Sequence, residues 1–134
     1  MNENHVTLKI FEFDAAPEEL SLSLGLEPTK TAVKGEKYSK LNKTYPWNYW
    51  EHRWVRKEER FIGELVEEFL LNVIVPKKDI LRNILTKHRG ELSVVQYLYH
   101  GCNPGLHINN DGLAILNYIG AELDVDIYCM SEDE

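Results

Sequence analysis

Several features that define large classes of protein are scarce or missing in this sequence. It holds only two cysteines, Cys102 and Cys129, without Cys-x-x-Cys spacing, which excludes a zinc ribbon and a secreted disulfide framework. No apolar run approaches the roughly 20 residues that cross a bilayer. The first residues also lack the basic and apolar stretches of a signal peptide. We therefore expect a cytoplasmic protein without membrane contact.

The sequence also lacks the motifs of common catalytic sites. It has no glycine-rich phosphate loop, no His-Glu-x-x-His and no Gly-x-Ser-x-Gly. We expect no cofactor, and the candidates for chemistry are isolated pairs of residues.

The composition that remains is that of a globular chain. Of its 134 residues, 43% are hydrophobic and 28% are charged. A chain of this length buries about two-thirds of the surface that it exposes when unfolded, so its core needs no disulfide or metal. We predict a single domain over residues 1–134.

Charge is distributed in three blocks. The formal net charge of −7 is the sum of −5 over residues 1–29, +5 over residues 30–60 and −7 over residues 61–134. An acidic protein repels nucleic acid at long range, so any polyanion site must lie in the middle block.

Periodicity and turn residues divide the first half of the chain. Alternating apolar residues over 6–13 predict a strand, and a change of phase at Ile10-Phe11 is typical of a bulge or of a strand covered on both faces. Pro17 and Gly25 mark a short helix that Asp14 could cap. Residues 29–56 predict one or two strands joined by a polar turn.

The second half begins with two helices. Phe61, Leu65 and Phe69 recur at helical spacing, and Pro76 opens a second helix that Gly90 is predicted to end. The later elements are a strand at 92–99, a type II turn at 103–105, a short strand at 106–108, a helix at 109–120 and a strand at 123–130.

Two stretches share one order of elements. A strand, a helix, Leu24-Gly25-Leu26-Glu27 and a strand resemble a strand, a helix, Ile119-Gly120-Ala121-Glu122 and a strand. This similarity indicates duplicated β-α-β units of the ferredoxin-like kind, whose crossover helices lie on one face of the sheet. We predict an α+β fold in two layers, with a mainly antiparallel sheet and helices on one face.

Motifs along nearly the whole chain are similar to those of a known family. They are Pro17-Glu18-Glu19-Leu20, the stretch 24–29, Lys34-Gly35-Glu36, the stretch 104–108 and the stretch 119–128. Together they resemble the bacterial domain-of-unknown-function family DUF4279. The resemblance implies no activity, but small acidic domains of this sort sometimes serve as immunity proteins in bacterial toxin systems.

A thiol and two imidazoles lie close together in the sequence. If Pro104-Gly105 closes a tight hairpin, Cys102 faces His107 across the strands at about 5 Å, and His100 lies nearby. A thiol beside an imidazole is the start of a nucleophile–base pair. We favour ordinary hairpin residues, because no orienting group or oxyanion element is identifiable.

Asp124 and Asp126 are placed on one face of the last strand, about 7 Å apart. They could share a divalent cation or act as acid and base. Hard cations usually need six or more oxygen ligands, and the spacing supplies no third carboxylate. We therefore favour a solvent-facing strand or carboxylates that pair with the lysines of the middle block.

The middle block mixes basic and aromatic residues. Its candidate binding residues are Trp47, Tyr49, Trp50, Trp54, Lys37 and Lys40. Cations and rings on a strand suit single-stranded nucleic acid, and tryptophan, tyrosine and arginine also anchor protein interfaces. A core strand beside a lysine-rich turn explains the same pattern.

We expect a non-enzymatic protein-interaction domain whose partner is another protein, of the immunity type that neutralises a bacterial toxin. RNA or single-stranded DNA binding through residues 30–60 is the alternative, because that block alone is basic. An enzyme built on Cys102, His107 and His100 ranks third.

Overall fold

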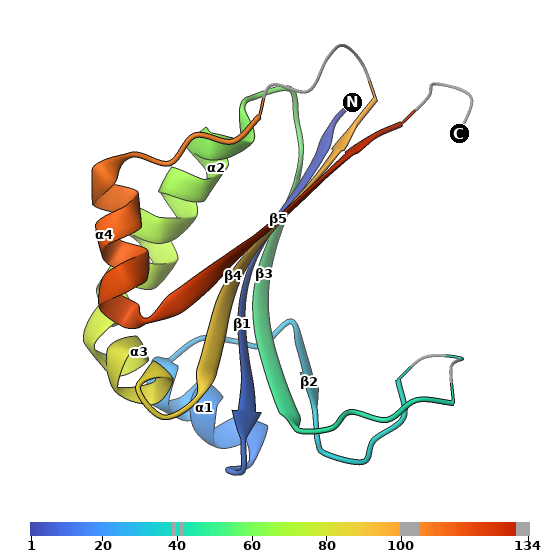
Figure 1. Ribbon diagram of the computed structural model, residues 1–134, viewed down its shortest axis with the longest axis vertical. Helices are drawn as coiled ribbons and strands as arrows, with labels where there is room; N and C mark the ends of the chain where they lie inside the picture. Colours follow the sequence, from blue (N-terminus) through green and yellow to red (C-terminus); the bar gives the residue numbers. More distant parts are fainter. Residues whose placement is uncertain (39, 41, 100–104, 131–134) are drawn as a thin grey trace.

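A computed structural model describes residues 1–38, 40, 42–99 and 105–130 (Figure 1). The strands are β1 (Glu3–Phe13), β2 (Lys30–Ala32), β3 (Asn48–Lys57), β4 (Arg89–Leu98) and β5 (Ala121–Cys129). The helices are α1 (Pro17–Leu24), α2 (Ile62–Phe69), α3 (Lys78–Leu85) and α4 (Asn110–Ile119). A π-helical turn (Leu70–Ile74) and a 3-10 turn (Val75–Lys77) join α2 to α3, so these two helices form one winding segment.

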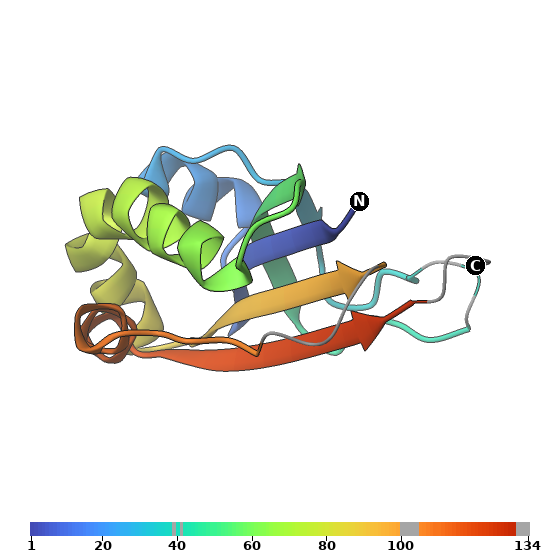
Figure 2. The same ribbon diagram turned by 90° about the horizontal axis from the view of Figure 1, so that it is seen from above.

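The strands form one five-stranded sheet in the order β2-β3-β1-β4-β5. All neighbouring strands are antiparallel except β4 and β5, which are parallel. From β1 to β4 the order and directions are those of a ferredoxin-like β-α-β-β-α-β unit, and α4 then adds β5 at one edge. The helices lie on one face of the sheet, as Figure 2 shows. The predicted α+β class is confirmed.

Both predicted β-α-β crossovers join parallel strands. In the first, β1 and β2 are parallel because each pairs antiparallel with β3, which lies between them. In the second, α4 joins β4 to its direct neighbour β5. The two stretches therefore share a strand–helix–strand order but not a sheet geometry.

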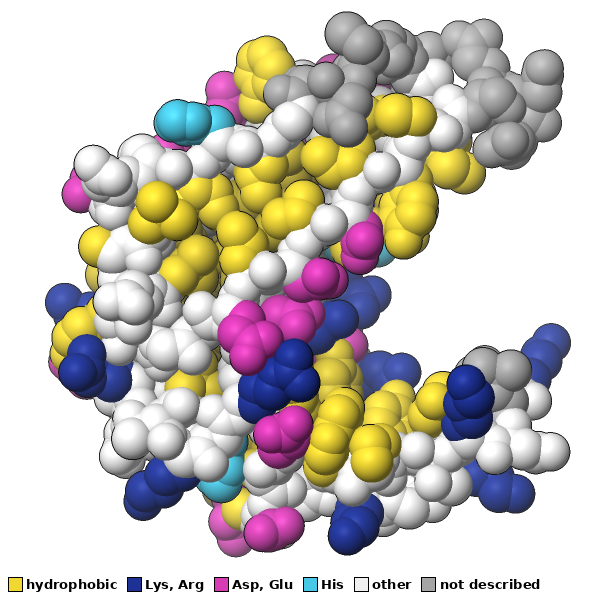
Figure 3. All heavy atoms as spheres, in the orientation of Figure 1, with side chains coloured by type: hydrophobic (Ala, Val, Ile, Leu, Met, Phe, Trp, Pro, Cys, Tyr) yellow, Lys and Arg dark blue, Asp and Glu magenta, His cyan; other side chains and the backbone are white. Residues whose placement is uncertain are grey.

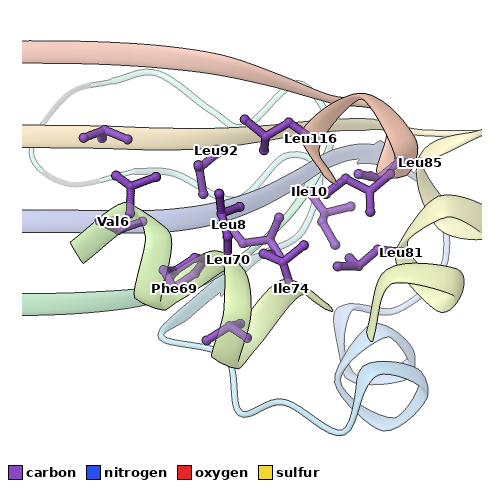
Figure 4. Packing of buried hydrophobic residues seen from close by; sticks show 14 of the residues in the cluster. Val6, Leu8, Ile10, Phe69, Leu70, Ile74, Leu81, Leu85, Leu92 and Leu116 are labelled. Carbon is purple, nitrogen blue, oxygen red and sulfur yellow. The ribbon is translucent and has the colours of Figure 1, made fainter. Parts of the chain in front are cut away.

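The core lies between the sheet and the helices (Figure 4). Val6, Leu8 and Ile10 of β1 are fully buried, and they belong to one cluster with residues of every helix. Trp50 of β3 is also fully buried, and its indole Nε1 donates a hydrogen bond to Ser21 Oγ at 3.0 Å. This layer needs the alternation of apolar residues that the sequence shows on β1.

The change of phase in β1 is a bulge. The pairing with β3 shifts register between Phe11 and Phe13, and Glu12 between them has a φ of 65°. Phe13 consequently enters the core, while Phe11 lies on the opposite face and stacks on Trp47 with ring centroids 5.2 Å apart. The strand thus buries aromatic rings on both faces near this end.

The helix ends agree only in part with the predictions. Gly25 ends α1 with a φ of 64°, as predicted, but the N-cap is Ala16 and Asp14 makes no capping bond. Phe61 lies outside α2 and is 64% exposed. Gly90 does not end a helix: it lies in β4, where a Cβ would stand 2.5 Å from the Leu85 side chain.

The predicted short strand at 106–108 is wrong. This stretch has no regular structure and lies against α2, where the carbonyl oxygen of His107 would be 2.8 Å from a Cβ on Gly63. β4 lies between β1 and β5 and pairs with them over nearly its whole length, so residues 106–108 have no free side of β4 to pair with. The predicted turn residues Asn103 and Pro104 lie outside the described residues.

Candidate functional site

The sheet face opposite the helices is lined mainly by polar side chains, and we call it the open face. Its side chains form rows across the strands because the register fixes which residues are opposite one another. From β3 to β5 the rows are Glu51-Lys9-Glu91-Glu122, Arg53-Thr7-Ser93-Asp124, Val55-His5-Val95-Asp126 and Lys57-Glu3-Tyr97-Tyr128. Charged, hydroxyl and aromatic groups are thus placed side by side on a rigid support.

A hollow of about 160 Å³ lies at the centre of the open face. The short side chains of Thr7 and Ser93 are only 2% and 3% exposed, because longer neighbours rise around them. Those neighbours are His5, Lys9, Arg53, Val95 and Tyr97. The hollow offers two hydroxyls and two cations. Glu51 and Glu91 flank Lys9 in its row, and Glu51 also pairs with Arg53, which weakens the attraction of an anion.

A buried carboxylate anchors the β3 side of the open face. Glu51 is 3% exposed and pairs with Arg53, whose Nη2 lies 2.8 Å from Glu51 Oε2. The Tyr49 hydroxyl donates to Glu51 Oε1 at 2.9 Å. Burial, with the charge of Glu51 beside it, raises the pKa of the Tyr49 hydroxyl far above its ordinary value.

Carboxylates dominate the opposite side of the open face, and we call Glu91, Glu122, Asp124 and Asp126 the acidic margin. Glu122 pairs with Arg89 at 3.1 Å. Within the described chain, Asp124 and Asp126 have neither an ion pair nor a hydrogen bond from a side chain. Burial raises the pKa of Glu91, and the charge of Asp124 adds to that rise. Among the described residues, negative charge without a neighbouring cation is therefore concentrated at Asp124 and Asp126, whereas Glu122 has Arg89 and Glu91 has Lys9 beside it.

The acidic margin adjoins an exposed apolar row on the other face of β5. Leu123 is 42% exposed and Val125 is 37% exposed, although both point to the helix side of the sheet. In Figure 3, hydrophobic side chains gather on the helix side of β5, and Asp and Glu side chains follow its other side. Helix α4 thus leaves part of β5 uncovered.

The predicted aspartate pair shares one face, as its spacing requires, but it meets no further ligands. In the described part of the chain, no three His, Cys, Asp or Glu side chains converge on a common point. Neither aspartate pairs with a lysine of the middle block there. This placement agrees with the favoured interpretation of the sequence, a strand whose aspartates face solvent.

The predicted thiol–imidazole pair depends on a hairpin that does not form from residues 106–108. His107 is exposed on an irregular segment packed against α2. Cys102 and His100 lie outside the described residues. The described part of the chain therefore provides no distance between the thiol and an imidazole of this candidate pair.

The middle block does not form one aromatic platform. The prediction that Trp50 is a binding residue is wrong, because its side chain is fully buried on the helix side of the sheet. Trp54 is half-buried on that same face and meets Phe69 edge to face at 5.2 Å. Tyr49 and Trp47 are half-buried, and Trp47 stacks on Phe11. Alternation along β3 sends the rings to opposite faces.

The two lysines of the candidate set lie between β2 and β3. The described residues 33–38, 40 and 42–47 of this connection project beyond the sheet (Figure 1), and we call them the arm. Lys37 and Lys40 are exposed there, and Lys37 forms an isolated bridge with Thr44. The arm rings of Tyr38 and Tyr45 contact one another edge to face at 5.1 Å. The lysines are accessible, whereas most of the rings are engaged within the protein.

The sequence reasoning missed the central hollow and the exposure of β5. The alternation of His5, Thr7 and Lys9 with buried apolar residues is the signal that could have placed three of the hollow's residues on one face. The position of these three side chains next to Arg53 and Ser93 depends on the order of the strands in the sheet. The edge position of β5 likewise depends on topology and not on its own sequence.

In the described residues, no helix has the length and apolarity to cross a membrane. No curated protein and no solved structure gives a significant match to the chain. The family described as Domain of unknown function (DUF4279) matches residues 2–130, which is nearly the entire chain. The predicted resemblance is thereby confirmed, and the chain belongs to the DUF4279 family.

Proposed function

We propose that this chain is a non-enzymatic protein-binding domain whose acidic margin receives a basic surface of another protein. The observation that carries the proposal is the pair Asp124 and Asp126, two exposed carboxylates without an ion-pair partner among the described residues. On the other face of the same edge strand, Leu123 and Val125 are also exposed. Apolar contact area next to uncompensated charge is typical of a surface that a partner covers.

An immunity protein that neutralises a basic bacterial toxin fits this arrangement. Such a protein needs only to cover its target, so it requires no catalytic group. Long-range attraction to a basic target would speed association and make its rate fall as salt concentration rises. A cytoplasmic location belongs to this proposal, because an exposed free thiol such as that of Cys129 suits a reducing compartment.

The test uses two variants with the same change in net charge. Asp124→Lys with Asp126→Lys reverses the acidic margin, whereas Glu18→Lys with Glu19→Lys reverses two exposed carboxylates on α1. Proteins captured by the wild-type chain in extracts of its native host are identified, and their association rates are measured at two salt concentrations.

The proposal expects a basic partner whose association slows with salt and weakens at least tenfold with the margin variant. The α1 variant should retain wild-type affinity. An equal loss of affinity in both variants would show that only the net charge of the chain matters. A captured partner that binds both variants with wild-type affinity would contradict the proposal.

A second candidate function is single-stranded nucleic-acid binding by the arm. The observation that favours it is the exposure of Lys34, Lys37, Lys40 and Lys43 on the arm. Fluorescence anisotropy with a labelled single-stranded RNA tests it at low and moderate salt. Affinity no tighter than millimolar at low salt, or unchanged affinity in the Lys37→Ala, Lys40→Ala double variant, would remove this candidate.

A further inference from the structure

We infer that β5 is a strand-addition site, which takes an extended segment of a basic protein as a sixth strand of the sheet. In that segment, lysine or arginine alternates with apolar residues. The inference rests on the proposed function and specifies how the partner is held.

The backbone of β5 is available along one side. Its nine residues pair with β4 over the whole length, from Gly90 opposite Ala121 to Leu98 opposite Cys129, and β5 is the last strand in the sheet order. No strand in the described residues pairs with its other side. An edge strand presents unpaired N–H and C=O groups that can bind another extended chain.

The two edges of the sheet differ in how they are protected. At the opposite edge, β2 has only three residues, and the arm follows it. β5 is longer, holds no proline or lysine, and keeps a regular register with β4. Short strands, charged side chains, proline and bulges are the usual means of preventing edge pairing. On β5 only the carboxylates provide such protection, and they repel an acidic strand but not a basic one.

The side chains of β5 specify the chemistry of the added strand. Glu122, Asp124 and Asp126 point to the open face, while Leu123, Val125 and Ile127 point to the helix side. Residues directly opposite each other in neighbouring strands have Cβ atoms about 4.5–5.5 Å apart. An added strand with cations at alternate positions would therefore meet the carboxylates, and its apolar positions would cover Leu123 and Val125.

The same charges argue against a second copy of the chain as the occupant. Two β5 strands pairing antiparallel around Val125 would place Asp124 of one copy opposite Asp126 of the other. Like charges directly opposite in a sheet are destabilising. The acidic residues thus disfavour self-pairing and favour a basic strand.

The test uses synthetic peptides with the intact chain. The probe is a nine-residue peptide of alternating lysine and valine, and its controls carry backbone N-methyl groups on every valine or on every lysine. Each methylation removes the hydrogen-bond donors of one edge of an extended peptide and leaves the charge unchanged. Binding is measured by calorimetry, and amide hydrogen exchange is followed along β5.

The inference predicts that one methylated peptide binds like the probe and the other at least tenfold more weakly. The probe should also protect alternate amides of β5 from exchange. Binding should fall at least tenfold in the Asp124→Lys, Asp126→Lys variant and stay unchanged in the Glu18→Lys, Glu19→Lys variant.

Equal binding of both methylated peptides, without protection of β5, would overturn strand addition and leave the proposed acidic binding surface standing. Failure of the probe to bind would also overturn strand addition. The proposed function is contradicted by a different result, namely that the host partner binds the Asp124→Lys, Asp126→Lys variant as tightly as the wild type. Protection of β5 that rises with protein concentration in the absence of peptide would identify a second copy as the occupant and overturn the inference.

Discussion

The two faces of the sheet have different tasks, and consecutive residues of β1 show the difference. Val6, Leu8 and Ile10 point to the helices and are fully buried, whereas His5 and Lys9 point to the open face and remain half-exposed. Burial of the first set contributes to the hydrophobic stabilisation of the fold, with the rest of the core cluster. The second set is not needed to exclude water from the core, so its residue types are free to serve binding.

The division is not complete, because the open face also holds buried residues. Glu51 lies there with the Tyr49 hydroxyl and the Arg53 guanidinium as partners. Phe11 is 6% exposed under Trp47. The β3 side of the open face therefore contributes to stability, whereas the β5 side carries accessible charge.

The largest expected effect is on the helix side of β1. Leu8→Ala removes a fully buried side chain and leaves a cavity, so we expect a loss of about 2–5 kcal/mol in the free energy of unfolding. Urea-induced unfolding followed by tryptophan fluorescence measures this loss.

The matched control for Leu8 is its neighbour on the open face. Lys9→Ala should lower the free energy of unfolding by no more than about 1 kcal/mol. A half-exposed side chain leaves no cavity, and the lost attraction to Glu51 and Glu91 is that of an exposed charge. Similar losses for the two variants would contradict the division of tasks between the faces.

A smaller effect is expected on the β3 side of the open face. Arg53→Ala removes the cation beside the buried Glu51 carboxylate and leaves that carboxylate with the Tyr49 hydroxyl alone. Leaving a buried polar group without a partner costs roughly 1–3 kcal/mol, and the half-exposure of Arg53 places the expected loss at the low end. Urea unfolding at pH 7 provides the measurement.

A double variant tests whether charge causes that loss. When Glu51→Gln is added to Arg53→Ala, a neutral amide replaces the carboxylate, and part of the lost stability should return. If the double variant is no more stable than Arg53→Ala, the loss comes from the packing of the arginine stem and not from its charge.

The fold was predictable where local patterns decide it. Alternation located β1 and β5, the change of phase located the bulge within two residues, and Gly25 and Gly120 ended their helices as predicted. These signals depend on side-chain sterics and periodicity, which act over a few residues. The class of the fold followed from the order of the elements.

Features set by strand order could not be predicted in the same way. A turn signal before residues 106–108 favoured a hairpin, but the parallel pairing of β4 with β5 required a crossover instead. Trp50 and Tyr49 are neighbours in the sequence and lie on opposite faces, and only the position of the helices determines which of them is buried. The edge position of β5 is a similar consequence of topology.

The smallest expected effect concerns Glu91, at the boundary between the hollow and the acidic margin. Burial raises its pKa, and the carboxylates of Asp124 and Glu122 add to the rise, so the folded state favours the protonated form. The stability contributed by protonated Glu91 is complete below its unfolded pKa of about 4.3 and is lost as pH rises through the folded value.

Glu91→Gln, which stays neutral, should therefore unfold at a higher urea concentration than the wild type at pH 7, and the two midpoints should converge at pH 3.5. Glu36→Gln on the exposed arm makes the same change in charge and should show no such gain. A Glu91→Gln advantage that persists unchanged at pH 3.5 would show that its cause is packing rather than the charge of the margin.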